Sequence, residues 1–221
     1  WKGGGGGRAT EEEKPRRGEV LGPLEGPGVR REKSWHKVGM RATGRDKISG
    51  EDVEMTERYL SKLQTREGTP ETPAGATWQT GVVAALYDAI ARSARDWLIH
   101  FLETRVPSAL GKPLSTLPRF HAILGEIDGL LLSNEALLEL ALNKADDLKT
   151  AFAEAAQVKR LVTENAITAV ARAVEVTGNP GLSQDNPLER HYRNVLCGRI
   201  HTPQADVVLE GAGRNAFSKT V

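Results

Sequence analysis

The sequence predicts a mainly α-helical protein, with an up-and-down helical bundle at the carboxy end, a small remnant of a β domain before it, and a disordered amino-terminal stretch. Over residues 77–221, apolar side chains recur at steps of three and four residues, which is the spacing of a buried helix face. Residues 35–55 instead hold short apolar pieces between glycines, as short strands do. Residues 1–34 carry a run of glycines and almost no side chain that could be buried.

The part before the bundle divides into three segments. Residues 1–34 are predicted to be a disordered, low-complexity segment, because so little apolar burial cannot offset the entropy lost on ordering. Residues 35–55 are predicted to form two or three strands that turn at Gly39, Gly44 and Gly50, and so small a sheet must pack on another element. Residues 56–76 are polar and contain proline and glycine, so we predict a linker there.

The first long helix is predicted from Thr77, its cap, to about Arg105, because Pro107 stops it. The face expected to be buried consists of Val82, Val83, Leu86, Ile90, Ala94, Trp97, Leu98 and Phe101.

Two further long helices and two short ones complete the predicted bundle. The second begins at Ser115, and the third runs from near Asp146, whose carboxylate favours a helix start, to a glycine stop at Gly178. The short helices cover residues 187–197 and 203 to about 217. Long helices with short connections predict an up-and-down bundle.

Charge and composition exclude several classes of protein. The chain has 30 Lys and Arg against 29 Asp and Glu, and this balance disfavours binding to nucleic acid or to a membrane surface. The sequence has no run of about 18 apolar residues, so no membrane span is predicted. The single cysteine, Cys197, favours a reducing, cytoplasmic location and is expected to be a packing residue. The histidines lack the paired spacing of a metal site, so none is predicted.

Several short segments, taken in order, carry a family resemblance. They are Trp35–Gly44 (WHKVGMRATG), Arg105 ahead of LGKPL, Val174–Gly181 (VEVTGNPG), the helix LERHYRN, and Arg199–Gln204 (RIHTPQ). Together they resemble the carboxy-terminal half of the acyl-CoA dehydrogenase superfamily, over roughly residues 35–219. In that family a flavin lies between a sheet domain and a four-helix bundle, and subunits form tetramers through the bundle.

The resemblance implies a flavin-dependent oxidoreductase that uses FAD or FMN, forms a homo-oligomer, and acts on a small molecule, with an acyl-CoA as a candidate substrate. It covers only the later half of a complete subunit. We therefore expect this chain to be a truncated fragment, inactive alone.

Five residues are assigned to the cofactor by the resemblance. Arg105 is similar to an arginine that holds the flavin phosphates, a role suited to a permanently charged guanidinium, although a basic residue also suits a helix carboxy end. Glu175, Gly178 and Gly181 match a segment that contacts the flavin of a neighbouring subunit, and Gln204 follows the active-site loop. Glu175 stands where relatives have Gln and cannot donate an amide hydrogen bond.

The segment RIHTPQ lies where the family's dehydrogenases carry the glutamate that removes a substrate proton. Thr202 occupies that position and cannot act as a base at neutral pH. The order His201-Thr202-Pro203 is more similar to the flavin monooxygenase branch, which includes dibenzothiophene monooxygenase, and it implies that His201 is catalytic. The alternative is that His201 only packs the next helix start. We expect this loop and the Gly178 turn to lie within reach of one pocket.

Two other interpretations stay open. The chain could be a non-catalytic helical module that only oligomerises, or the product of a broken reading frame, as the abrupt change near Ser34 suggests. The substrate and the choice between dehydrogenase and monooxygenase chemistry also stay open. Exposed apolar helices are expected to make the chain self-associate.

Overall fold

The computed structural model describes residues 17–20, 22, 25–54, 60–64, 73–144 and 151–218. The chain divides into two compact units. The first lies within residues 1–71, and the second contains residues 72–221 together with the short segment Val38–Met40. Across the described ranges, no helix is both long and apolar enough to cross a membrane.

The first unit contains two small antiparallel sheets. Strand β2 (Val29–Glu32) pairs with β3 (Lys47–Gly50), and β1 (Arg17–Val20) pairs with β4 (Leu60–Gln64). At β2 the structure has a strand where disorder was expected, because β3 supplies its backbone partners and Arg31 reaches Asp46 at 2.9 Å. Strand β1 likewise lies in the segment expected to be disordered, and β4 lies in the expected linker. Residues 1–16, 21, 23 and 24 lie outside the described residues.

The strand partners inside residues 35–55 differ from the prediction. In the described part of that segment β3 is the one strand, and its partner comes from before residue 35. Residues 41–43 form instead the 3₁₀ turn η1 (Arg41–Thr43), followed by Gly44 at a φ of +41°. A positive φ suits glycine because it has no Cβ, so Gly44 does mark a turn.

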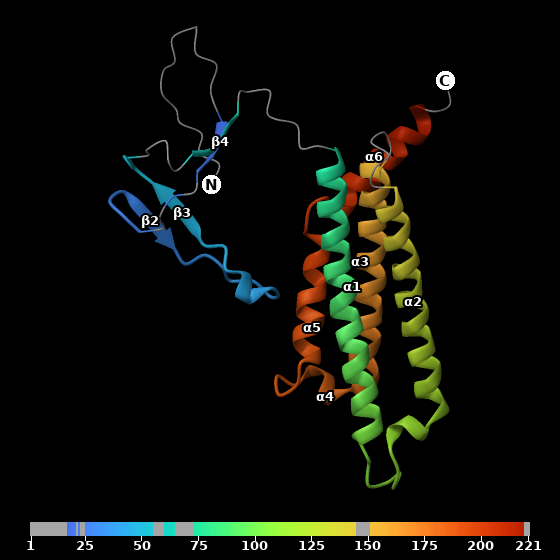
Figure 1. The fold of residues 1–221 in the computed structure, drawn as a ribbon. Helices are drawn as coiled ribbons and strands as arrows, with labels where there is room; N and C mark the ends of the chain where they lie inside the picture. The colour runs from blue at the N-terminus through green and yellow to red at the C-terminus, as the bar shows by residue number, and fades with distance from the viewer. Residues whose placement is uncertain are drawn as a thin grey trace. The chain divides into compact units, whose positions relative to one another are not determined.

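The second unit is the predicted helical bundle, and the structure confirms it (Figure 1). The long helices α1 (Pro73–Thr104), α2 (Pro118–Asn143) and α3 (Ala151–Thr177) lie side by side, with α2 running opposite to the other two. Helix α1 begins four residues before Thr77, at a proline that suits a first helical turn. The expected start of α3 near Asp146 lies outside the described residues.

Shorter elements complete the bundle. The 3₁₀ turn η3 (Leu114–Thr116) precedes α2, and α4 (Asn179–Leu182) follows α3 at one end of the bundle. Helix α5 (Leu188–Val195) then returns along α1 and α3, and η4 (Leu196–Arg199) leads to α6 (Ala205–Ser218) at the other end (Figure 1).

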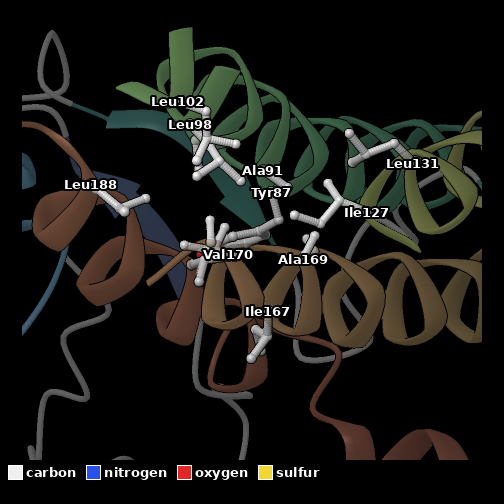
Figure 2. Close-up of a cluster of buried hydrophobic side chains, with 14 of the residues drawn as sticks. Tyr87, Ala91, Leu98, Leu102, Ile127, Leu131, Ile167, Ala169, Val170 and Leu188 are labelled. Carbon is white, nitrogen blue, oxygen red and sulfur yellow. The ribbon is translucent and has the colours of Figure 1, made fainter. Parts of the chain in front are cut away.

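The core contains residues of α1, α2, α3 and α5 (Figure 2). The buried face of α1 consists of Ala84, Tyr87, Ala91, Ala94, Leu98 and Leu102. The predicted face was partly wrong, because Val82 and Leu86 are 63% and 44% exposed. Small alanines, rather than the bulkiest side chains, allow α1 to approach α3 closely. On α3 the same holds for Ala155, Ala156, Ala166, Ala169 and Ala173, all of which are buried.

A polar network lies inside this apolar core. Asn134 of α2 is fully buried, and its amide nitrogen donates to Asp88 of α1 at 2.8 Å. Its amide oxygen accepts from Asn165 of α3 at 2.9 Å, and Arg92 donates to Asp88 at 2.6 Å. Because buried polar groups need these partners, the network fixes how the three helices face one another.

The segment Val38–Met40 packs on α5. Arg193 Nη1 donates to the Val38 carbonyl at 2.7 Å, and the Met40 amide donates to Asn194 Oδ1 at 2.7 Å. Gly39 is buried between them, where a Cβ would lie 2.2 Å from the Arg193 carbonyl oxygen. Glycine is therefore required at this position by close approach rather than by the predicted turn.

Candidate functional site

The loop that carries His201 is held by a buried lysine of α3. Lys159 is 2% exposed, and its Nζ donates to the carbonyl oxygens of Gly198, His201 and Pro203 at 2.8, 2.5 and 3.0 Å. An ammonium group has three N–H donors, so these contacts use all of them. Burial lowers the pKa of Lys159 below its usual value.

The ring of His201 meets a buried tyrosine of α1. The Tyr87 hydroxyl lies 2.7 Å from Nδ1 of His201, and the two rings meet edge to face at 5.8 Å. Tyr87 is fully buried, whereas His201 is an exposed residue. Burial, with a smaller electrostatic effect of Cys197, raises the pKa of Tyr87 to about 12, so the phenol is protonated at neutral pH.

Gly198 lets the loop lie close to both helices. A Cβ at this position would be 2.5 Å from Cγ2 of Thr163 and 3.1 Å from the ring of Tyr87. Any larger residue would push the loop away from α1 and α3. The loop is therefore fixed by packing at Gly198 and by the ammonium of Lys159.

The carboxylate that contacts the loop, that of Glu164, forms an ion pair with Arg199. Glu164 of α3 accepts from Arg199 Nη2 at 2.6 Å and from its Nε at 2.9 Å. The Arg199 guanidinium thereby holds the pKa of Glu164 below its usual value, against the opposing effect of burial. Residues 199–204 contain no carboxylate of their own. The loop therefore offers an imidazole and a hydroxyl, from His201 and Thr202, rather than a carboxylate base.

Four of the residues predicted to bind a cofactor lie at the other end of the bundle, where α1 and α3 finish (Figure 1). Arg105 is exposed, and no carboxylate within the described ranges pairs with its guanidinium. Glu175 is exposed and pairs with Arg172 at 2.6 Å. Gly178 is exposed at a φ of +64°, with no atom within 4 Å of where a Cβ would be.

Gly181, by contrast, is buried. A Cβ there would lie 2.1 Å from Oγ1 of Thr177 and 3.0 Å from the carbonyl oxygen of Val174. Packing of α4 on the end of α3 therefore explains this glycine by itself.

The two groups of predicted residues are not brought together within one chain. Gly178 follows Lys159, which contacts the His201 loop, by 19 positions, and α3 fills the interval, so the two lie roughly 28 Å apart along the helix. Gln204 lies on the His201 side, directly before α6. The expectation of a single pocket is wrong for one chain, because α5 carries the chain back along the bundle before the loop begins.

The residues of the far end suit the anionic part of a flavin. Arg105 offers an unpaired guanidinium among the described residues, and the backbone at Gly178 is open to a ligand. Arg172 pairs with both Glu175 and Glu126, at 2.6 and 2.9 Å, so it offsets only part of the negative charge that would repel a pyrophosphate. The opposite end offers the imidazole of His201.

Tyr87, Lys159 and Gly198 are the site residues that the sequence did not predict. Tyr87 lies on a helix face read as purely apolar, and Lys159 resembles the many lysines that remain at surfaces. The spacing of Tyr87 with Ala84 and Ala91 could have placed it in the core.

A sequence profile described as Acyl-CoA dehydrogenase, C-terminal domain, matches residues 82–204. The protein YdbM of Bacillus subtilis, classed by name with the acyl-CoA dehydrogenases, is 29% identical over 212 residues, which are 93% of this chain and 54% of YdbM. The mitochondrial short-chain specific acyl-CoA dehydrogenase of Bos taurus is 28% identical over 190 residues, 85% of this chain and 45% of that protein. The chain thus spans about half the length of these relatives.

Solved structures show the same fold. Butyryl-CoA dehydrogenase from Megasphaera elsdenii aligns with a TM-score of 0.73 at 23% identity, over 86% of this chain and 49% of that one. KijD3 in complex with FMN and a dTDP-linked amino sugar aligns with a TM-score of 0.75 at 21% identity, over 95% of this chain and 53% of that one. Because the family profile covers more than half of the chain, the protein belongs to the family described as Acyl-CoA dehydrogenase, C-terminal domain.

Proposed function

We propose that this chain supplies the helical-bundle part of a flavin-dependent oxidoreductase, with His201 facing the flavin. The observation that carries the proposal is the construction of the His201 loop. A buried lysine, a buried tyrosine and a closely packed glycine hold one exposed imidazole in place. A histidine that only packed the next helix would not need such support.

Flavin, when bound, would supply the electron transfer. His201 would move or hold a proton beside it, since an imidazole titrates near neutral pH. Thr202 can donate or accept a hydrogen bond but cannot remove a carbon-bound proton. This favours the monooxygenase-like chemistry of the family over the dehydrogenase chemistry that uses a glutamate in this loop. Both FAD and FMN remain candidates, and an acyl-CoA remains the candidate substrate of the dehydrogenase alternative.

The separation of the two predicted groups supports a homo-oligomer. Arg105, Glu175 and Gly178 would bind the phosphates of a flavin whose ring lies against His201 of another copy. Large apolar side chains remain exposed on α1 and α2, including Trp78, Val82, Leu86, Leu132, Leu140 and Leu142. Contiguous exposed apolar surface marks association sites. We propose a tetramer, as the family resemblance implies, in a reducing cytoplasmic compartment.

Flavin titration tests the proposal. The chain should quench the fluorescence of FAD or FMN weakly, because the family resemblance implies that a sheet domain, of which this chain holds a remnant, covers the flavin. Arg105→Gln should weaken FAD binding about tenfold, the effect of losing a charge-assisted hydrogen bond. Arg214→Gln, at an exposed position of α6, is the matched control and should leave binding unchanged.

Two outcomes would contradict the proposal. Binding that is equally strong for both variants would remove Arg105 from the site. A complete absence of binding, together with stable self-association, would favour the non-catalytic oligomerisation module.

A further inference from the structure

We propose that Lys159 and Tyr87 are positioning residues for His201: Lys159 fixes the backbone of its loop, and Tyr87 fixes which ring nitrogen carries the proton. The meaning of this inference for catalysis rests on the proposed function, in which His201 faces the flavin. The hydrogen bonds of Lys159 and Tyr87 lie within this chain, so their effect on His201 can be tested without a flavin.

Lys159 acts on three separate points of the loop. Its acceptors are the carbonyls of Gly198, His201 and Pro203, so a single ammonium group binds the loop at three points. A buried charge is costly unless polar groups surround it, and here three carbonyl dipoles do so. The lowered pKa of Lys159 agrees with this burial. Loss of the ammonium would remove one hydrogen-bond donor from each of the three carbonyls.

The packing at Gly198 fixes where the loop begins relative to α1 and α3. Gly198 lies against Thr163 of α3 and the ring of Tyr87 of α1, so the loop starts from a fixed point between the two helices. From there, the carbonyl of His201 turns toward Lys159 and its ring toward Tyr87. The imidazole is therefore held from its backbone and from its ring.

The hydrogen bond between Tyr87 and His201 has a defined direction. Tyr87 is fully buried, and within the described part of the chain the hydrogen-bond partner of its hydroxyl is Nδ1 of His201, at 2.7 Å. A buried hydroxyl hydrogen needs an acceptor, so the phenol donates and Nδ1 accepts. A neutral imidazole that accepts at Nδ1 carries its hydrogen on Nε2. His201 would then present an N–H donor, rather than a lone pair, from Nε2.

This assignment narrows the chemistry of the proposed site. A neutral His201 would act as a hydrogen-bond donor at Nε2 toward a bound flavin. It would not begin as a base at that nitrogen. The hydrogen bond from Tyr87 to Nδ1 would thus set which ring nitrogen of His201 carries the hydrogen, as the hydrogen bond at one ring nitrogen does for other functional histidines.

Long-range ¹H–¹⁵N spectroscopy of the full chain, labelled at histidine, measures the tautomer directly. At a pH where the imidazole is neutral, we expect His201 as the Nε2–H form alone, with its signals assigned by loss in His201→Gln. Tyr87→Phe removes the donor and keeps the ring, and it should give a mixture of both tautomers. His121, whose Nε2 lies 2.6 Å from the Ser115 carbonyl, is an internal control and should not change.

The wild-type spectrum alone can overturn the assignment. An Nδ1–H form of His201 would contradict it, whether or not Tyr87→Phe folds. An unchanged tautomer ratio in a folded Tyr87→Phe variant would also contradict the role of the phenol.

Lys159→Met tests the second positioning residue, because Met is an unbranched side chain one atom shorter than Lys and carries no charge or donor. Amide hydrogen exchange over residues 198–204 should accelerate at least about tenfold, as one carbonyl-bound donor is worth about 1.4 kcal/mol or more. The same variant should also give mixed His201 tautomers. Lys144→Met, which removes an exposed lysine paired with Glu154 at 2.8 Å, is the matched control and should change neither.

A readout on the wild-type chain covers the case in which Lys159→Met fails to fold. The ammonium hydrogens of Lys159 should exchange slowly enough to be seen in a lysine side-chain spectrum, and rapid exchange would contradict the geometry. Failure of the flavin titration with an Nε2–H tautomer intact would contradict the proposed function and leave this inference standing.

Discussion

Gly39 packs directly on the carbonyl of Arg193, so that a Cβ at residue 39 would lie 2.2 Å from the carbonyl oxygen. This contact joins a segment from before residue 41 to α5, the helix that leads to the His201 loop. The Met40 amide and Asn194 Oδ1 form a second link at 2.7 Å.

Gly39→Ala should therefore destabilise the bundle or detach this segment. Overpacking at such a site costs about 1–3 kcal/mol, and backbone cannot move aside as a side-chain end can. Denaturant unfolding of the variant measures the loss. Gly125→Ala on α2, with no atom within 4 Å of its Cβ position, should instead raise the free energy of unfolding by about 0.5–1 kcal/mol. Equal stability of the two variants would contradict the close contact at Gly39.

Asn134→Leu should destabilise the bundle by about 1–3 kcal/mol, because it leaves the buried carboxylate of Asp88 and the amide of Asn165 with one partner fewer. Thermal and denaturant unfolding provide the measurement. Asn143→Leu, at the exposed end of the same helix, is the control and should change stability by less than about 0.5 kcal/mol. A neutral Asn134→Leu would show that the network does not hold the three helices.

Tyr87 should give the chain an alkaline limit. Its pKa is raised from 10.0 to about 12 in the folded state, so the folded chain binds the phenol proton more tightly than the unfolded chain. This stabilising contribution is complete below pH 10 and is lost as pH rises through about 12. Between these values the free energy of unfolding should fall more steeply for the wild type than for Tyr87→Phe.

Lys159 also titrates in this pH range, but it affects the stability of the wild type and of Tyr87→Phe equally. The pKa of Lys159 is lowered, so its own contribution to stability rises with pH toward 10.5 in both proteins. Tyr192→Phe serves as the control for loss of a different phenol. Parallel alkaline curves for wild type and Tyr87→Phe would show that the Tyr87 hydroxyl is not buried as described.

The helices could be predicted because their apolar periodicity and proline or glycine ends are local signals. The buried face of α1 was predicted only in part, since Val82 and Leu86 are as apolar as Leu98 and the sequence does not say which face meets α3. Strand β2 was missed because an isolated four-residue segment rich in arginine gives no strand signal until β3 pairs with it.

The candidate site was predicted from a resemblance and built by contacts that are distant in sequence. His201 was assigned from its motif, and its role stays a proposal. Its supports, Tyr87 and Lys159, lie 114 and 42 residues away. The single pocket failed for a similar reason, because the motif order does not show that α5 separates Gly178 from His201.

The most direct test of the account is a flavin titration of the histidine-labelled chain, followed through the imidazole signals. At saturating FMN or FAD, the His201 signals should shift or broaden. Shifts confined to other histidines, or unaltered His201 signals while the flavin is demonstrably bound, would contradict the claim that His201 faces the flavin.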